Sequence, residues 1–76
     1  MKASQCRKLA EQYRQQADEM TEAETKLGMI FGFSDPVVIS TGESAHRYEQ
    51  EFQFWSWLAS LHPKARAAAL RKAAQL

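Results

Sequence analysis

Residues at intervals of seven form apolar rows in the first third of the chain, a spacing that aligns side chains along one stripe of a helix. One row consists of Cys6, Tyr13, Met20 and Leu27. A neighbouring row consists of Ala3, Leu9, Gln16, Ala23 and Ile30, with Ala10 and Ala17 beside it. Most of the intervening residues are good helix formers such as Gln, Glu, Arg and Lys. The pattern therefore predicts a helix from about Ser4, as its N-cap, to Leu27, with Gly28 as its stop.

A length of 76 residues, of which 45% are hydrophobic, predicts one small globular domain spanning residues 1–76. Domains of this size gain little net stability from burial, so disulfides, metals or oligomerisation often supply the remainder. The single cysteine, Cys6, excludes an internal disulfide, and one cysteine with two histidines is too few for a typical structural zinc site. Oligomerisation is the remaining means of stabilisation, and we expect a homodimer or a higher homo-oligomer.

The segment from Gly28 to Gly42 combines helix-breaking residues with a high apolar content. Because connections are usually polar, this composition predicts an ordered loop that packs on the domain or on a second copy. Val37–Ile39 is predicted to be a short extended segment that pairs with residues 29–33, with a second subunit or with another partner. Ser40 or Thr41 is expected to cap the second helix, since the residues up to Glu43 match a capping box.

The second predicted helix, which runs to about Leu61, is apolar on two sides in its C-terminal half. One stripe consists of Ala45, Tyr48, Phe52, Trp55 and Ala59. The other stripe consists of Phe54, Trp57, Leu58 and Leu61. A third helix is predicted from Pro63, which suits a first helical turn, to about Gln75. This helix is rich in alanine, and its only large apolar residues are Leu70 and Leu76.

Two interpretations of the second stripe remain open, and both give an all-α fold with a long first helix antiparallel to the aromatic second helix. In one, the third helix covers the stripe and the chain is a monomeric three-helix bundle. In the other, which we favour, the alanine helix covers too little, and the stripe forms an interface together with the loop. The predicted interface residues are Phe54, Trp57, Leu58, Leu61, Phe31, Phe33 and Val38.

The basic residues of the third helix raise two alternative functions. These residues are Lys64, Arg66, Arg71 and Lys72. They could track the phosphates of a nucleic acid, although the net charge is only +1 and no helix-turn-helix pattern is present. They could also hold a small anion such as a nucleotide at an oligomer interface. Separately, the helix start at Ser40 to Glu43 could hold an anion on free backbone N–H groups. Cations near a helix C-terminus also simply favour the helix dipole.

No residue cluster in the sequence predicts catalysis, a cofactor or a metal. Glu43, His46 and Glu49 share one side of the second helix but lack the further ligands of a carboxylate metal site, and Cys6 is expected to be a buried structural thiol. The chain has no apolar run long enough to span a membrane and no signal-peptide core, so a cytoplasmic location is the expectation. The sequence therefore predicts a non-enzymatic protein-interaction module, by analogy with small accessory proteins of phages and other mobile elements that bind and inhibit host factors.

Overall fold

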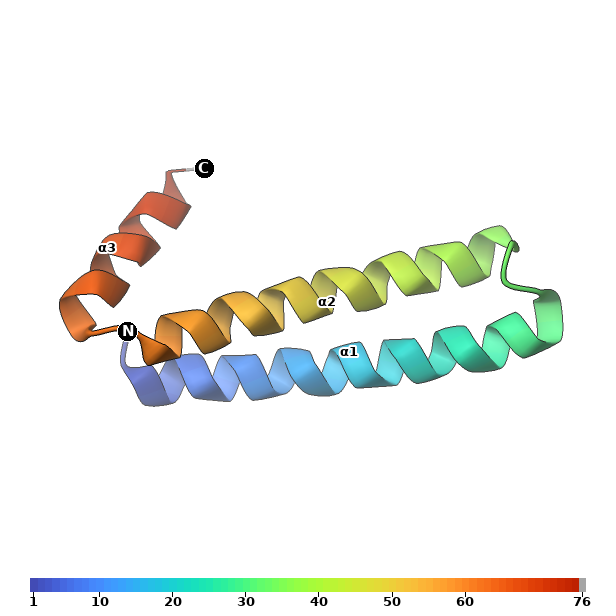
Figure 1. Ribbon diagram of the computed structural model, residues 1–76, viewed down its shortest axis with the longest axis horizontal. Coiled ribbons are helices and arrows are strands. Elements are labelled where there is room, and N and C mark those ends of the chain that lie inside the picture. Colours follow the sequence, from blue (N-terminus) through green and yellow to red (C-terminus); the bar gives the residue numbers. More distant parts are fainter. Residues whose placement is uncertain (76) are drawn as a thin grey trace.

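The computed structural model describes residues 1–75, and Leu76 lies outside the described residues. Three helices follow one another: α1 (Ala3–Phe31), α2 (Pro36–Ser60) and α3 (Pro63–Ala74). No strand is present within residues 1–75, so the predicted all-α class with a long first helix and a short third helix is confirmed (Figure 1). None of the helices in this part of the chain is both long enough and apolar enough to cross a bilayer.

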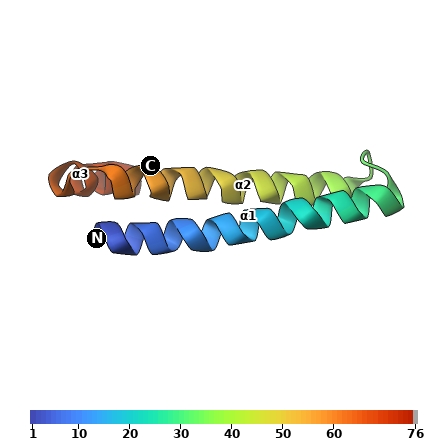
Figure 2. The same cartoon turned by 60° about the horizontal axis from the view of Figure 1, so that its bottom comes forward.

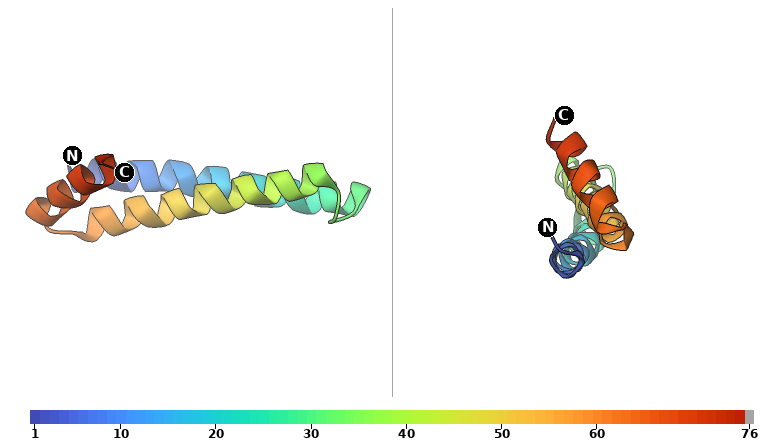
Figure 3. Two further views of the ribbon diagram at one scale, coloured as in Figure 1. Left: turned by 90° about the horizontal axis from the view of Figure 1, so that it is seen from above. Right: turned by 90° about the vertical axis from the view of Figure 1, so that its left-hand side faces the viewer.

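The three helices lie in a single layer. α1 and α2 run antiparallel and side by side along nearly their whole lengths (Figures 1 and 2). α3 leaves the end of α2 at a steep angle (Figure 1). Seen along the long axis, the three helices fall within one narrow band, with α3 in front of α2 (Figure 3). The shortest of the Cα extents, 48 × 24 × 12 Å, is less than the roughly 13–15 Å that the Cα atoms of two stacked helices would span. Both broad faces of the layer are therefore open to solvent.

Small residues bring α1 and α2 close together. The buried apolar residues along their contact are Cys6, Ala10, Ala17, Val38 and Ala45. Midway along the hairpin the Tyr13 and Tyr48 rings pack with their centroids 6.3 Å apart. On α1 the row from Cys6 to Leu27 contributes to this contact as predicted, but its partners are Ala10 and Ala17. The predicted partner row, which runs from Leu9 to Ile30, lies beside this contact rather than in it, and its Gln16 and Ile30 are exposed.

The first helix is longer than predicted, because Gly28 does not end it. α1 continues to Phe31, and the turn begins at Gly32, whose φ of 89° favours glycine. Gly28 is buried, and a Cβ at this position would overlap the ring of Phe33. Glycine at position 28 therefore serves the close approach of the Phe33 ring, and Gly32 is the residue that permits the turn.

The predictions for Val37–Ile39 and for the start of the second helix were wrong. Asp35 is the N-cap of α2, since its Oδ1 accepts a hydrogen bond from the Val37 N–H at 2.9 Å, and Pro36 occupies the first turn. Val37–Ile39 is therefore helical rather than extended. Thr41 lies inside the helix, where its hydroxyl donates to the Val37 carbonyl at 2.8 Å. The connection between α1 and α2 shrinks to residues 32–35.

The predicted third helix is confirmed within one residue at its C-terminal end. His62 is the N-cap of α3, and its Nδ1 accepts a hydrogen bond from the Lys64 N–H at 3.3 Å. Pro63 begins the helix, and the last turn carries Arg71 and Lys72, whose charges favour the helix dipole. α3 has few contacts with α2 and runs away from it after the turn (Figure 1). It therefore leaves most of α2 uncovered.

Candidate interaction surfaces

Large apolar side chains are exposed around the turn between α1 and α2. We call this group the apolar tip; it consists of Met29, Ile30, Phe31, Phe33, Val37 and Ile39. Phe31 and Phe33, both predicted interface residues, are 60% and 63% exposed. Val38, the third predicted loop residue, is only 1% exposed because it packs between α1 and α2. The apolar tip brings six exposed apolar residues to one end of an 8.7 kDa chain.

A second aromatic group lies at the other end of α2. Trp57 is 52% exposed and packs on Phe54 with a centroid distance of 6.3 Å, while Phe54 also meets Trp55 edge to face at 5.3 Å. Phe54 and Leu61 are half-buried, whereas Leu58 is fully buried. Of the four residues predicted for this interface, Trp57 is therefore the most accessible, and Leu58 packs within the chain itself.

The two predicted halves of the interface lie at opposite ends of the hairpin. The tip is formed where α1 passes into α2, and Trp57 lies in the last turn of α2 beside the start of α3 (Figure 1). Because the layer is 48 Å long, one chain does not bring these groups together. They can form one surface only if they meet across two molecules.

Arg66 is the only buried charged residue among those described, with 5% exposure. Its Nε donates to the Leu58 carbonyl at 2.9 Å and its Nη2 donates to the Leu61 carbonyl at 2.7 Å. Lys64, Arg71 and Lys72 are exposed. The predicted basic stripe therefore loses Arg66, which caps the C-terminus of α2. Its position shortly after a helix end was the available sequence signal, because basic side chains there can bond the last carbonyls.

The fold separates charge along the hairpin. The Tyr13–Tyr48 contact sets the register, so residue 15 lies about level with residue 46. The base half, residues 1–15 and 46–75, contains nine Lys or Arg and three Asp or Glu, a net side-chain charge of +6. The tip half, residues 16–45, contains one Lys and six Asp or Glu, a net charge of −5. In the sequence the first 27 residues balance, so only the hairpin reveals this separation.

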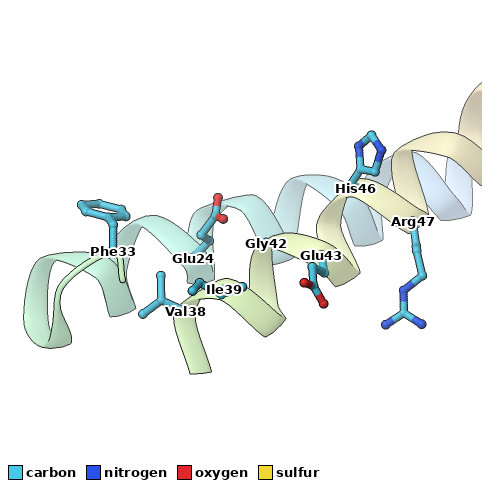
Figure 4. A pocket seen from close by; sticks show the side chains of 8 residues that line it. All are labelled: Glu24, Phe33, Val38, Ile39, Gly42, Glu43, His46 and Arg47. Atoms are coloured by element: carbon cyan, nitrogen blue, oxygen red, sulfur yellow. The ribbon is translucent and has the colours of Figure 1, made fainter. Parts of the chain in front are cut away.

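The two broad faces of the hairpin differ in chemistry. One face, which we call the tyrosine face, has a shallow groove lined by Tyr13, Ser44, Tyr48 and Glu51. The other, the glutamate face, has a wider groove lined by Glu24, Val38, Gly42 and His46, with Ile39 and Phe33 at its end (Figure 4). Arg47 borders both grooves. The glutamate face is rich in titratable groups. Helical spacing places the second row of α1, which includes Leu9, Ala23 and Ile30, on the tyrosine face.

The metal and anion sites considered on the second helix are not assembled in the described part of the chain. No group of three or more His, Cys, Asp or Glu side chains lies close enough to hold a metal ion in this part of the chain. Ser40 to Glu43 lie inside α2 rather than at its start, so the expected anion-binding N–H groups are engaged in the helix. Cys6 is fully buried. No protein-family model, no curated protein and no solved structure matches the chain.

Proposed function

We propose that this protein is a non-enzymatic protein-interaction module that associates through its exposed apolar residues. The single observation that carries the proposal is the one-layer architecture, 12 Å thick, with the apolar tip exposed at one end and Trp57 at the other. Stable helical domains bury the apolar side of each helix between at least two layers. A single layer with accessible aromatic residues therefore gains stability by acquiring a second layer from another molecule.

The small buried core supports the same proposal. The described apolar residues that are buried are three alanines with Cys6, Val38 and Leu58. Alanine and cysteine bury little area, so these residues supply only a modest part of the free energy of folding. Association would bury the half-exposed rings of the hairpin as well. It would also protect a surface that otherwise favours non-specific aggregation.

Light scattering across a range of protein concentrations tests this proposal. We expect the wild-type chain to be a dimer or a higher oligomer, and Phe31→Asp, in the apolar tip, to weaken that association while the helical circular dichroism is retained. Thr25→Asp is the matched control, because Thr25 is an exposed polar residue of α1 before the tip. A wild type that stays monomeric at millimolar concentration would refute self-association.

One observation favours a second function, nucleic-acid binding by the base half. The fold places nine of the ten basic residues in this half, including exposed Lys2, Arg7 and Lys8 together with Lys64 and Lys72. Such a cluster predicts affinity for phosphate backbones that falls steeply with salt. Fluorescence anisotropy with a labelled duplex tests this alternative. Binding that is absent at 50 mM salt, or unchanged by Lys64→Glu with Lys72→Glu, would argue against it.

A further inference from the structure

We propose that a second copy of this chain covers the tyrosine face in an antiparallel orientation, so that the tip of each copy lies against the base half of the other. This inference rests on the proposed function and specifies both the face and the direction of association. The result would be a two-layer assembly in which four long helices form the centre. The symmetric form of such a contact is a closed two-fold dimer.

The first argument is the unused apolar row of α1. The row has the seven-residue spacing of a helix–helix contact and consists of Leu9, Gln16, Ala23 and Ile30. The contact between α1 and α2 nevertheless uses Ala10 and Ala17 instead. Leu9 and Ala23 are half-buried and Ile30 is 71% exposed. Helical geometry places this row beside Tyr13, whose ring lines the groove of the tyrosine face. α1 therefore carries one apolar row for α2 and a second for a helix outside the chain.

Residues of α2 continue the same surface. Ser44 and Tyr48 line the tyrosine-face groove, and Val37 lies one helical repeat before Ser44. Trp55 follows Tyr48 by seven residues, and its indole N–H donates to Glu51 at 3.2 Å, which leaves most of the ring for packing. On the glutamate face the corresponding flank of α1 carries Arg7 and Arg14. The tyrosine-face groove has Glu51 and the shared Arg47, whereas the glutamate face has Glu24, Glu43 and His46 in addition to these flanking arginines. Burial of the glutamate face would remove more charges from water, so the tyrosine face is the better contact surface.

The orientation follows from charge. Two hairpins stacked in parallel would bring the two base halves together, each with a net charge of +6, and likewise the two tip halves, each at −5. Antiparallel stacking instead places each base half against a tip half of opposite sign. Like charges in contact are a strong means of rejecting a wrong arrangement. The separation of charge along the hairpin therefore selects the antiparallel dimer.

The antiparallel arrangement also brings the apolar tip of each copy to the base half of the other. On the tyrosine face this region presents Trp55, which follows Tyr48 by seven residues. Trp57 follows Ile39 by five helical turns and therefore lies on the glutamate side, outside this contact. The alanine-rich surface of α3 allows close approach of bulky side chains such as Phe31. Each end of the dimer would thus be covered by the opposite end of the second copy.

A matched pair of substitutions tests the face. Val37 and Ile39 are exposed β-branched residues two positions apart in the first turns of α2, but they lie on the tyrosine and glutamate faces respectively. We expect Val37→Lys to raise the dissociation constant of the dimer by roughly tenfold or more, and Ile39→Lys to change it by less than about threefold. Sedimentation equilibrium measures both. Equal effects, or a larger effect of Ile39→Lys, would overturn the assignment of the tyrosine face.

Spin-label distances test the orientation. A label on Ser34→Cys, in the exposed turn, reports the tip, and a label on Ser60→Cys reports the base; Cys6 is fully buried and stays in place. In the antiparallel dimer the two tip labels are separated by a distance that approaches the 48 Å length of the molecule. A mixture of the two labelled proteins adds a short tip-to-base distance that neither protein shows alone.

The possible results separate the two proposals. A dimer with tip-to-tip distances of about 20 Å, roughly two helix spacings, would be parallel and would overturn this inference while leaving self-association intact. A monomer at all concentrations would refute the proposed self-association itself. A dimer with long tip-to-tip distances that is disrupted by Val37→Lys and retained in Ile39→Lys is the expected result.

Discussion

Arg66 donates a hydrogen bond from Nε to the main-chain carbonyl of Leu58 at 2.9 Å, across the turn between α2 and α3. Two further bonds from the same guanidinium reach the Leu61 carbonyl at 2.7 Å and the Met1 carbonyl at 3.4 Å. The last carbonyls of a helix lack partners within the helix, and a positive charge near them favours the helix dipole. Arg66 therefore joins the end of α2, the start of α3 and the beginning of the chain.

The first prediction concerns this guanidinium. Arg66→Met should lower the free energy of unfolding by about 2–4 kcal/mol, because it removes charge-assisted bonds and leaves the Leu58 carbonyl with only its bond from the Leu61 N–H. Arg66→Lys should recover only part of the loss, since an ammonium group cannot reproduce the planar fork of donors. Urea denaturation measures both variants at a fixed protein concentration. Arg71→Met is the control, because Arg71 is exposed, and a loss as large as that of Arg66→Met would contradict the capping role.

The second prediction concerns the contact between Gly28 and Phe33. Alanine is the better helix former by about 1 kcal/mol, so Gly28→Ala would ordinarily stabilise a helix. Here the added Cβ would overlap the Phe33 ring and displace it, so we expect the free energy of unfolding to fall.

A double-mutant cycle isolates the Phe33 contribution. In a Phe33→Ala background the same Gly28→Ala substitution should become stabilising, because the obstructing ring is gone. Thermal unfolding at one protein concentration measures the four chains of the cycle. The same sign of effect in both backgrounds would mean that the ring does not determine the residue at position 28.

The third prediction separates conformational cost from steric cost in the turn. Gly32 has a φ of 89°, and a Cβ added there would meet no atom within 4 Å. Gly32→Ala should therefore destabilise by about 1–3 kcal/mol through backbone strain alone. Ser34→Ala, in the same exposed turn, is the control and should change stability by less than about 0.5 kcal/mol. An unchanged midpoint in Gly32→Ala would show that the turn does not require the positive φ.

The fourth prediction concerns the alanines between α1 and α2. Ala17 is 8% exposed, and a leucine in its place would force the helices apart, at a cost of about 1–3 kcal/mol. Gln15→Leu introduces the same side chain two residues earlier on an exposed position, and it should change stability by less than about 0.5 kcal/mol. Denaturation curves compare the two variants. Equal stability would indicate that α1 and α2 have room for large side chains along their contact.

Local patterns predicted the helices well and the connection between the first two helices poorly. The heptad spacing on α1 and Pro63 before α3 placed those helices within a few residues of the observed bounds. The glycines at positions 28 and 42 misled the prediction, since both lie inside helices. Asp35 and Pro36 carried the usable signal for the start of α2, because an N-cap followed by proline needs no tertiary contact.

The amino-acid sequence by itself determined three helices, the absence of a disulfide and an excess of aromatic side chains on α2, because these depend on local periodicity and composition. Only the tertiary structure decided which apolar row of α1 meets α2, since two rows had the required spacing and the alanines allowed the closer approach. It also decided that Leu58 and Val38 are buried while Trp57 and the tip are exposed, and that charge separates along the hairpin. These properties depend on which distant residues become neighbours, and the antiparallel pairing of α1 with α2 establishes that.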